Sequence, residues 1–225
     1  MSFGSMNNMK KLLLLLFSLM LSLNSYGDSK SSIQNAIADA YDSKDYELAI
    51  KLSLPLAEAG DIGYQVMLYT LYVFNDNQIE EACKWVKKAA EQDDAFAHSL
   101  LGNRYLRGQG FLQDYKKAFY WLEKGAKAGD SQSQRWLAGM YMRGEGVLKD
   151  YKKAFLWHSK AAEQNDFNSM MVVGEMYCKG IGTQKNLVKS KYWMSKAYDE
   201  VSKYQLPLMK EDIKDIWEEC DLANY

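Results

Sequence analysis

Apolar residues recur at helical spacing along most of the chain, and the pattern of apolar, glycine and charged positions repeats every 36 residues. Segments 95–130 and 131–166 align over their full length without a gap. Several series of residues keep step with that period, which is the signature of a repeat architecture. These series are Tyr105, Tyr141 and Tyr177; Gly108, Gly144 and Gly180; Gly110, Gly146 and Gly182; Trp85, Trp121, Trp157 and Trp193; and Ala82, Ala118 and Ala154.

Each unit is expected to contain two helices. The first carries Leu101 and Tyr105 at helical spacing and ends at Gly108, because a residue that tolerates positive φ commonly stops a helix. After a short glycine-bearing loop, Asp114 stands where the second helix needs an N-cap. The second helix is expected to bury Tyr115, Ala118, Phe119, Trp121, Leu122 and Ala126. The pattern predicts an all-α chain of helix hairpins.

A set of positions in segment 95–130, with counterparts one period later, carries a family resemblance. The positions are Leu101, Gly102, Tyr105, Gly108, Gly110, Asp114, Tyr115, Ala118, Trp121, Gly125 and Ala126. They resemble the Sel1-like repeat, a relative of the tetratricopeptide repeat. The resemblance implies a right-handed α/α solenoid of about five helix-hairpin repeats with a C-terminal capping helix. It weakens toward the ends, since unit 62–94 lacks the glycine pair and Leu187 stands where the family prefers tyrosine.

The predicted division of the chain follows from the repeat. We expect a signal peptide over 1–27, a degenerate N-terminal repeat over 28–61 and a C-terminal cap over 201–225. The full repeats between them are expected at 62–94, 95–130, 131–166 and 167–200. Atypical end units are expected in a solenoid, because each unit covers the apolar face of its neighbour.

The N-terminus has the pattern of a secretory leader. Lys10 and Lys11 precede an apolar stretch from Leu12 to Leu23, and small residues follow up to an expected cleavage site after Gly27. The alternative is a retained membrane anchor. We expect a periplasmic or secreted protein without stable membrane insertion after cleavage. Loss of the two lysines moves the net charge from −1 to −3, which argues against nucleic acid as the main partner.

By the geometry of the resembled family, the first helix of each unit lines a concave face that binds a protein partner. The candidate partner-binding residues are Val66, Thr70, Val73, Phe74, Phe96, Ser99, Asn103, Arg107, Gln132, Arg135, Met142, Arg143, Asn168, Met171, Glu175 and Lys179; Leu106, Gly139 and Cys178 fall in the same registers.

Two features of this face suggest the chemistry of the partner. Arg107, Arg143 and Lys179 share one register and form a basic ladder for an acidic segment, or they simply favour the helix dipole from the last turn. Val66 and Phe74, with their apolar neighbours, form an apolar groove, or they pack against the N-terminal repeat.

No catalytic, cofactor or metal site is expected. Only two histidines occur, and His98 alone lies near the expected groove, whereas His158 is expected to be solvated or interhelical. Hydrolytic and metal sites require several such groups to converge. Of the three cysteines, Cys178 and Cys220 can pair if the last helix folds back; otherwise all three thiols are free.

These expectations favour a non-enzymatic, exported binding module. Its partner would be another protein, such as a toxin or an envelope protein, with an acidic or apolar segment. Adaptor, scaffold and inhibitor or immunity protein stay open as roles. The alternatives are an enzyme or regulator related to envelope polysaccharide and a secreted effector that acts on a host.

Overall fold

The computed structural model describes residues 28–75, 78–203 and 207–224, and this part of the chain is entirely helical. The elements are α2 (Asp28–Asp42), α3 (Tyr46–Glu58), α4 (Ile62–Phe74), α5 (Ile79–Glu91), α6 (Ala95–Arg107), α7 (Tyr115–Lys127), α8 (Ser131–Arg143), α9 (Tyr151–Glu163), α10 (Phe167–Lys179), α11 (Leu187–Lys203), α12 (Pro207–Glu219) and a 3-10 turn, η1 (Leu222–Asn224). The expected leader lies outside the described residues. No described helix is long and apolar enough to cross a membrane.

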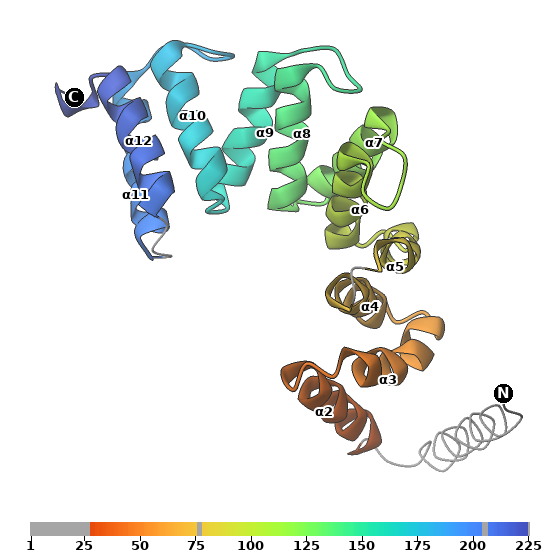
Figure 1. Ribbon diagram of the computed structural model, residues 1–225. Coiled ribbons are helices and arrows are strands. Elements are labelled where there is room, and N and C mark those ends of the chain that lie inside the picture. The colour runs from red at the N-terminus through yellow and green to blue at the C-terminus, as the bar shows by residue number, and fades with distance from the viewer. Residues whose placement is uncertain (1–27, 76–77, 204–206, 225) are drawn as a thin grey trace, which may run out of the picture.

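Successive helices pair into hairpins that stack along an arc (Figure 1). The hairpins are α2–α3, α4–α5, α6–α7, α8–α9 and α10–α11, and α2 and α12 lie at the two ends of the arc. Helices α4 and α6 lie toward the inside of the arc, and α5 and α7 toward the outside. The predicted all-α solenoid of hairpin repeats is confirmed.

Local sequence signals set the ends of the helices, as predicted. The side chain of Asp114 accepts a hydrogen bond from the backbone nitrogen of Lys117 at the start of α7. Gly108 ends α6 in the left-handed conformation, with φ of 66°. Both devices recur one period later, at Asp150 and Gly144. Because they satisfy exposed backbone groups at the helix ends, the hairpin is specified within each repeat.

The core follows the predicted alanine and leucine positions. Ala118 and Leu122 of α7 are fully buried, together with Leu101 of α6 and Leu137 of α8. A small residue at the register of Ala118 lets the two helix axes approach closely. Interior packing therefore runs without a break through the middle hairpins.

Three residues that were expected inside lie at the edge of the core. Phe119 is only partly buried. Tyr115 is 38 % exposed, because it begins α7 beside the loop. Trp121 is only partly buried, and Lys124, one turn later, lies over its ring at 5.6 Å from the centroid. The same arrangement recurs in the other repeats, since lysine lies over tryptophan three residues earlier in α5, α9 and α11. Lysine stems thus cover the indole faces that the core leaves open.

The C-terminal end folds back on the last hairpin, as expected for a capping helix. Ile213 and Leu222 pack into the same core as Met194 of α11. Cys178 of α10 and Cys220 form a disulfide with a Cα–Cα distance of 5.9 Å, whereas Cys83 is a buried free thiol. Helix α11 continues to Lys203, so the boundary expected at 200 falls inside this helix.

Candidate binding site on the concave face

The predicted partner-binding residues all lie on the first helices α4, α6, α8 and α10, but they differ in burial. Phe74, Phe96, Arg107, Gln132 and Arg143 are exposed. The partly buried ones are Val66, Thr70, Val73, Asn103, Arg135, Met142, Asn168, Met171 and Glu175. Lys179 is also exposed.

The prediction for Ser99 is wrong. This side chain is 2 % exposed, and Leu106, Gly139 and Cys178 are also buried. A small or apolar side chain at these registers is covered by the helices around it, because successive first helices contact one another, as α6 contacts α8. The face open to a partner is therefore narrower than the family register alone indicates.

An apolar groove of about 750 Å³ lies between α2 and α4, at the N-terminal end of the arc. Val66 and Thr70, both predicted, line it together with Tyr41 and Met67. The residues of α2 were missed because the concave register was not extended into the degenerate first repeat. Tyr41 marks that register, since it stands one residue before the end of α2 as Val73 does in α4.

Phe74 lies at the C-terminal end of α4. The sequence left open whether it belongs to an apolar groove or packs against the N-terminal repeat, and the structure shows features of both. Its ring stacks on Tyr46 of α3 at 6.0 Å, and Tyr46 in turn makes an edge contact with Tyr41. Phe74 nevertheless keeps 53 % of its surface exposed. Val73 packs against the main core instead. The apolar end of the face is thus partly packed against the first repeat and partly open.

Two arginines enclose Trp136 at the centre of the face. The Cζ atom of Arg107, from α6, lies 5.1 Å from the ring centroid, and that of Arg135 lies 4.6 Å from it. Such cation–π contacts hold a guanidinium in place without consuming its hydrogen-bond donors. Sequence reasoning missed Trp136, although its aromatic side chain one residue after Arg135 could have indicated it.

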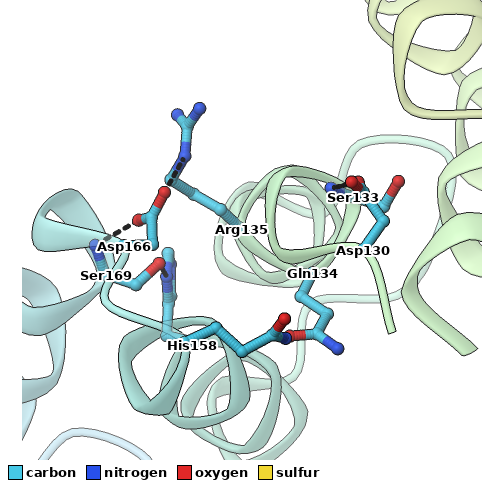
Figure 2. A network of polar contacts seen from close by, with 8 residues as sticks. Asp130, Ser133, Gln134, Arg135, His158, Asp166 and Ser169 are labelled. Carbon is cyan, nitrogen blue, oxygen red and sulfur yellow. Dashed lines mark hydrogen bonds and ion pairs between the residues drawn. The ribbon is translucent and has the colours of Figure 1, made fainter. Parts of the chain in front are cut away.

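Arg135 is further fixed by Asp166, the N-cap of α10. The Nε atom of Arg135 donates to the Asp166 carboxylate at 3.1 Å, and the other carboxylate oxygen accepts from the backbone nitrogen of Ser169. Figure 2 shows the terminal nitrogens of Arg135 pointing away from Asp166. The hydrogen-bond donors on these terminal nitrogens therefore point outward, while Asp166 and Trp136 hold the guanidinium group in place.

The three residues of the predicted basic ladder differ in how far neighbouring carboxylates neutralise their charge. Arg143 pairs with Glu145 at 2.8 Å. Lys179 pairs with Glu175 at 2.8 Å and with Glu219 of α12 at 3.0 Å, and these hydrogen bonds raise the pKa of its ammonium group. In the described part of the chain no carboxylate pairs with Arg107. Of the three ladder residues, Arg107 beside Trp136 therefore carries the uncompensated positive charge.

Asn103 lies beside this centre on α6, one helical turn before Arg107, and its Nδ2 atom is buried without a hydrogen-bond partner. Because this atom is covered by its neighbours, a ligand cannot reach it without a local movement. The groups that the centre of the face presents are therefore the guanidinium donors and the aromatic ring.

Neither histidine belongs to this face. His98, which was expected near the groove, is 2 % exposed, and its Nε2 atom lies 3.0 Å from the carbonyl oxygen of Ala90. Burial lowers its pKa. His158 is buried between α9 and α10, so the interhelical interpretation is the right one. Among the described residues no group of three or more His, Cys, Asp or Glu side chains could hold a metal ion.

Solved structures with a similar fold include Sel1 repeat proteins and a related bacterial antigen. A Sel1 repeat protein from Oxalobacter formigenes superposes with a TM-score of 0.69 at 23 % identity, covering 87 % of this chain and 84 % of that one. A putative Sel1 repeat protein from Klebsiella pneumoniae gives 0.52 at 23 % identity, covering 74 % and 89 %. A protective antigen of uropathogenic Escherichia coli gives 0.65 at 28 % identity; 68 % of this chain spans only 33 % of that protein.

No curated protein matches the chain. The Sel1 repeat pattern matches five segments, at residues 40–61, 71–94, 95–130, 131–166 and 168–201, which together cover more than half of the sequence. Proteins built from this repeat are generally protein-interaction modules and typically non-catalytic. The chain belongs to the Sel1 repeat family.

Proposed function

We propose that this protein is an exported binding module that holds an extended segment of one protein partner along its concave face. The observation that carries the proposal is Trp136 enclosed by Arg107 and Arg135, with guanidinium donors left over. Buried or fixed arginine and tryptophan side chains are the residues that most often dominate the energy of protein interfaces.

The face specifies the chemistry of the bound segment. An acidic side chain or a terminal carboxylate would accept hydrogen bonds from the free guanidinium nitrogens of Arg107 and Arg135. An apolar side chain of the same segment would fill the groove between α2 and α4. The partner is therefore a protein with an acidic stretch next to an apolar one.

Export is the second part of the proposal. It rests on the basic and apolar pattern of residues 1–27, with cleavage after Gly27. Bacterial proteins of this repeat family are often periplasmic or secreted. In that compartment the module would serve as an adaptor or scaffold, or as an inhibitor that covers part of a toxin or envelope protein.

A peptide-selection experiment tests the binding site. The chain from Asp28 onward is used to select ligands from a random peptide library, and the affinity of a selected peptide is measured by fluorescence anisotropy. We expect selected peptides to combine acidic and apolar residues. Because a charge-assisted hydrogen bond contributes about 1.5–3 kcal/mol, Arg107→Glu should weaken binding by at least about tenfold.

The matched control is Lys51→Glu, a charge reversal at an exposed position of α3 on another part of the surface. It should leave the affinity unchanged. Selection of peptides without acidic residues, or equal affinity for Arg107→Glu and the unmodified protein, would contradict the proposal.

A further inference from the structure

We propose that a second surface, the edge formed by the loops of the last three hairpins, binds peripherally to an anionic lipid membrane. This loop edge comprises residues 108–117, 144–153 and 180–189, which connect α6 to α7, α8 to α9 and α10 to α11. It is separate from the concave residues described above, and it does not depend on the proposed function.

The loop edge exposes apolar side chains almost completely. Leu112 is 91 % exposed and Leu148 is 89 % exposed, at equivalent positions of successive loops. Val188, at the start of α11, is 67 % exposed, and Tyr115 and Tyr151 also remain open beside the leucines. A single exposed leucine needs no explanation, but two at equivalent positions, with Val188 on the next hairpin, mark an interaction surface.

Glycine contacts join the loops into one continuous edge. Gly146 has φ of 69°, and a Cβ atom there would lie 2.6 Å from the backbone carbonyl carbon of Tyr115. Gly182 packs in the same way against the backbone of Tyr151. Each loop therefore rests on the helix start of the preceding hairpin, and the loops follow one side of the arc (Figure 1).

The charge of this edge is opposite to that of the chain. Its cations are Lys116, Lys117, Lys149, Lys152, Lys153, Lys185 and Lys189, and its acids are Asp114, Glu145 and Asp150, whereas the whole chain has a net charge of −1.

The three acids already have partners. Asp114 and Asp150 accept backbone hydrogen bonds at the starts of α7 and α9, and they also pair with Lys117 at 3.6 Å and Lys153 at 3.8 Å. Backbone hydrogen bonding is the main cause that lowers the pKa of Asp114. Glu145 pairs with Arg143. Among the described residues, Lys116 and Lys152 have no carboxylate partner. The surface therefore presents uncompensated lysines.

Protruding leucines among lysines fit a lipid surface better than a protein or a polysaccharide. The leucines stand out from the loops, so they need an apolar medium that can surround them, which the acyl boundary of a bilayer supplies. Lysine stems can follow them while the ammonium groups stay at the headgroup level. Lysines near a membrane surface are attracted by anionic lipids.

The first two hairpins lack this pattern. At the corresponding edge, α5 begins with Ile79, Glu80 and Glu81, and α3 is preceded by Asp45 and carries Glu47 in its first turn. The acidic N-terminal end would be repelled by an anionic membrane. The protein would therefore attach through its C-terminal three hairpins.

Vesicle binding tests the inference with the chain that begins at Asp28, which carries every described helix. Vesicles of phosphatidylglycerol and phosphatidylcholine should sediment the protein with an affinity at least about tenfold higher than vesicles of phosphatidylcholine alone, and high salt should remove the difference. The double substitution Leu112→Ser, Leu148→Ser should lower the affinity for the anionic vesicles by about tenfold or more.

Two controls make the result specific. Leu156→Ser changes a half-exposed leucine within α9, outside the loop edge, and should leave vesicle binding unchanged. The selected peptide of the concave face should bind the leucine double variant as before. Equal sedimentation with both kinds of vesicle would overturn the inference. So would vesicle binding that is lost in the variant Lys116→Glu, Lys152→Glu but kept in the leucine double variant, because attraction to charged headgroups without insertion of the leucines would then account for it.

Discussion

His158 of α9 is hydrogen-bonded to Ser169 of α10, with 3.1 Å between Nδ1 and Oγ, and both side chains are buried (Figure 2). One repeat earlier, the position of His158 is held by Leu122 and that of Ser169 by Ser133. Histidine in place of leucine thus gives the buried serine a hydrogen-bond partner, which the Oγ atom of Ser133 lacks in the described structure. Burial, and then the positive charges of Arg135 and Arg143, lower the pKa of His158 to about 4.

We expect this histidine to make folding sensitive to acid. The unfolded chain binds the proton near pH 6.5, whereas the folded protein binds it only near pH 4, so stability is complete above the unfolded pKa and is lost as the pH falls between the two values. The loss should reach about 3 kcal/mol. Urea unfolding at several pH values would measure it. His158→Leu combined with Ser169→Ala should flatten the dependence over this window, and an unchanged slope would contradict the assignment.

His98 takes a place that glutamine holds in neighbouring repeats. Gln65 and Gln134 donate to the carbonyl oxygens of Ala57 and Ala126, as His98 does to Ala90. The Nδ1 atom of His98 is buried without a partner. His98→Gln should therefore keep the free energy of unfolding within about 1 kcal/mol of the original or raise it, because glutamine makes the same bond.

His98→Ala is the companion variant. It leaves the carbonyl of Ala90 without its partner and should cost about 1–3 kcal/mol. Chemical denaturation of both variants at neutral pH compares them, and equal stability of the two would show that the hydrogen bond to Ala90 contributes nothing.

Alanine substitutions at two glycines with positive φ allow the cost of backbone strain to be compared with the cost of a steric clash. At Gly129, with φ of 97°, an added Cβ would meet nothing within 4 Å, whereas at Gly146 it would meet the backbone of Tyr115. Gly129→Ala should cost about 1 kcal/mol through strain alone. Gly146→Ala should cost roughly 2–4 kcal/mol, since the loop must also move away from α7. Thermal unfolding would rank them, and the reverse order would refute the stacked loops.

The disulfide between Cys178 and Cys220 should stabilise the C-terminal cap. It closes a segment with a sequence separation of 42 residues. By loop-closure entropy its removal should cost about 4 kcal/mol. In a solenoid the effect should concentrate in α12 and α11, because each hairpin depends mainly on its neighbours. Hydrogen exchange before and after reduction would show it, and Cys83→Ala should change neither pattern. Uniform loss of protection over all hairpins would contradict this expectation.

The concave site was predicted in outline but not in detail. Arg107 and Arg135 were assigned to this face from the repeat register, and Asn103 with them. Trp136 was not, because the register did not place its position among those that face the groove. Ser99 was assigned to the face, although a serine can be wholly covered where two helices meet. A register states which way a side chain points but not how close the next helix lies.

The sequence by itself determined the hairpins, because their signals are local. Asp114 caps its own helix, Gly108 ends its own helix, and the 36-residue period repeats both. Only the tertiary structure decided which charges remain available, because that depends on residues brought together from different repeats or from the cap. Glu219 of α12 neutralises Lys179, whereas Trp136 supports Arg107 without neutralising it. The charge that the arc presents is set by these distances between hairpins, which no single repeat encodes.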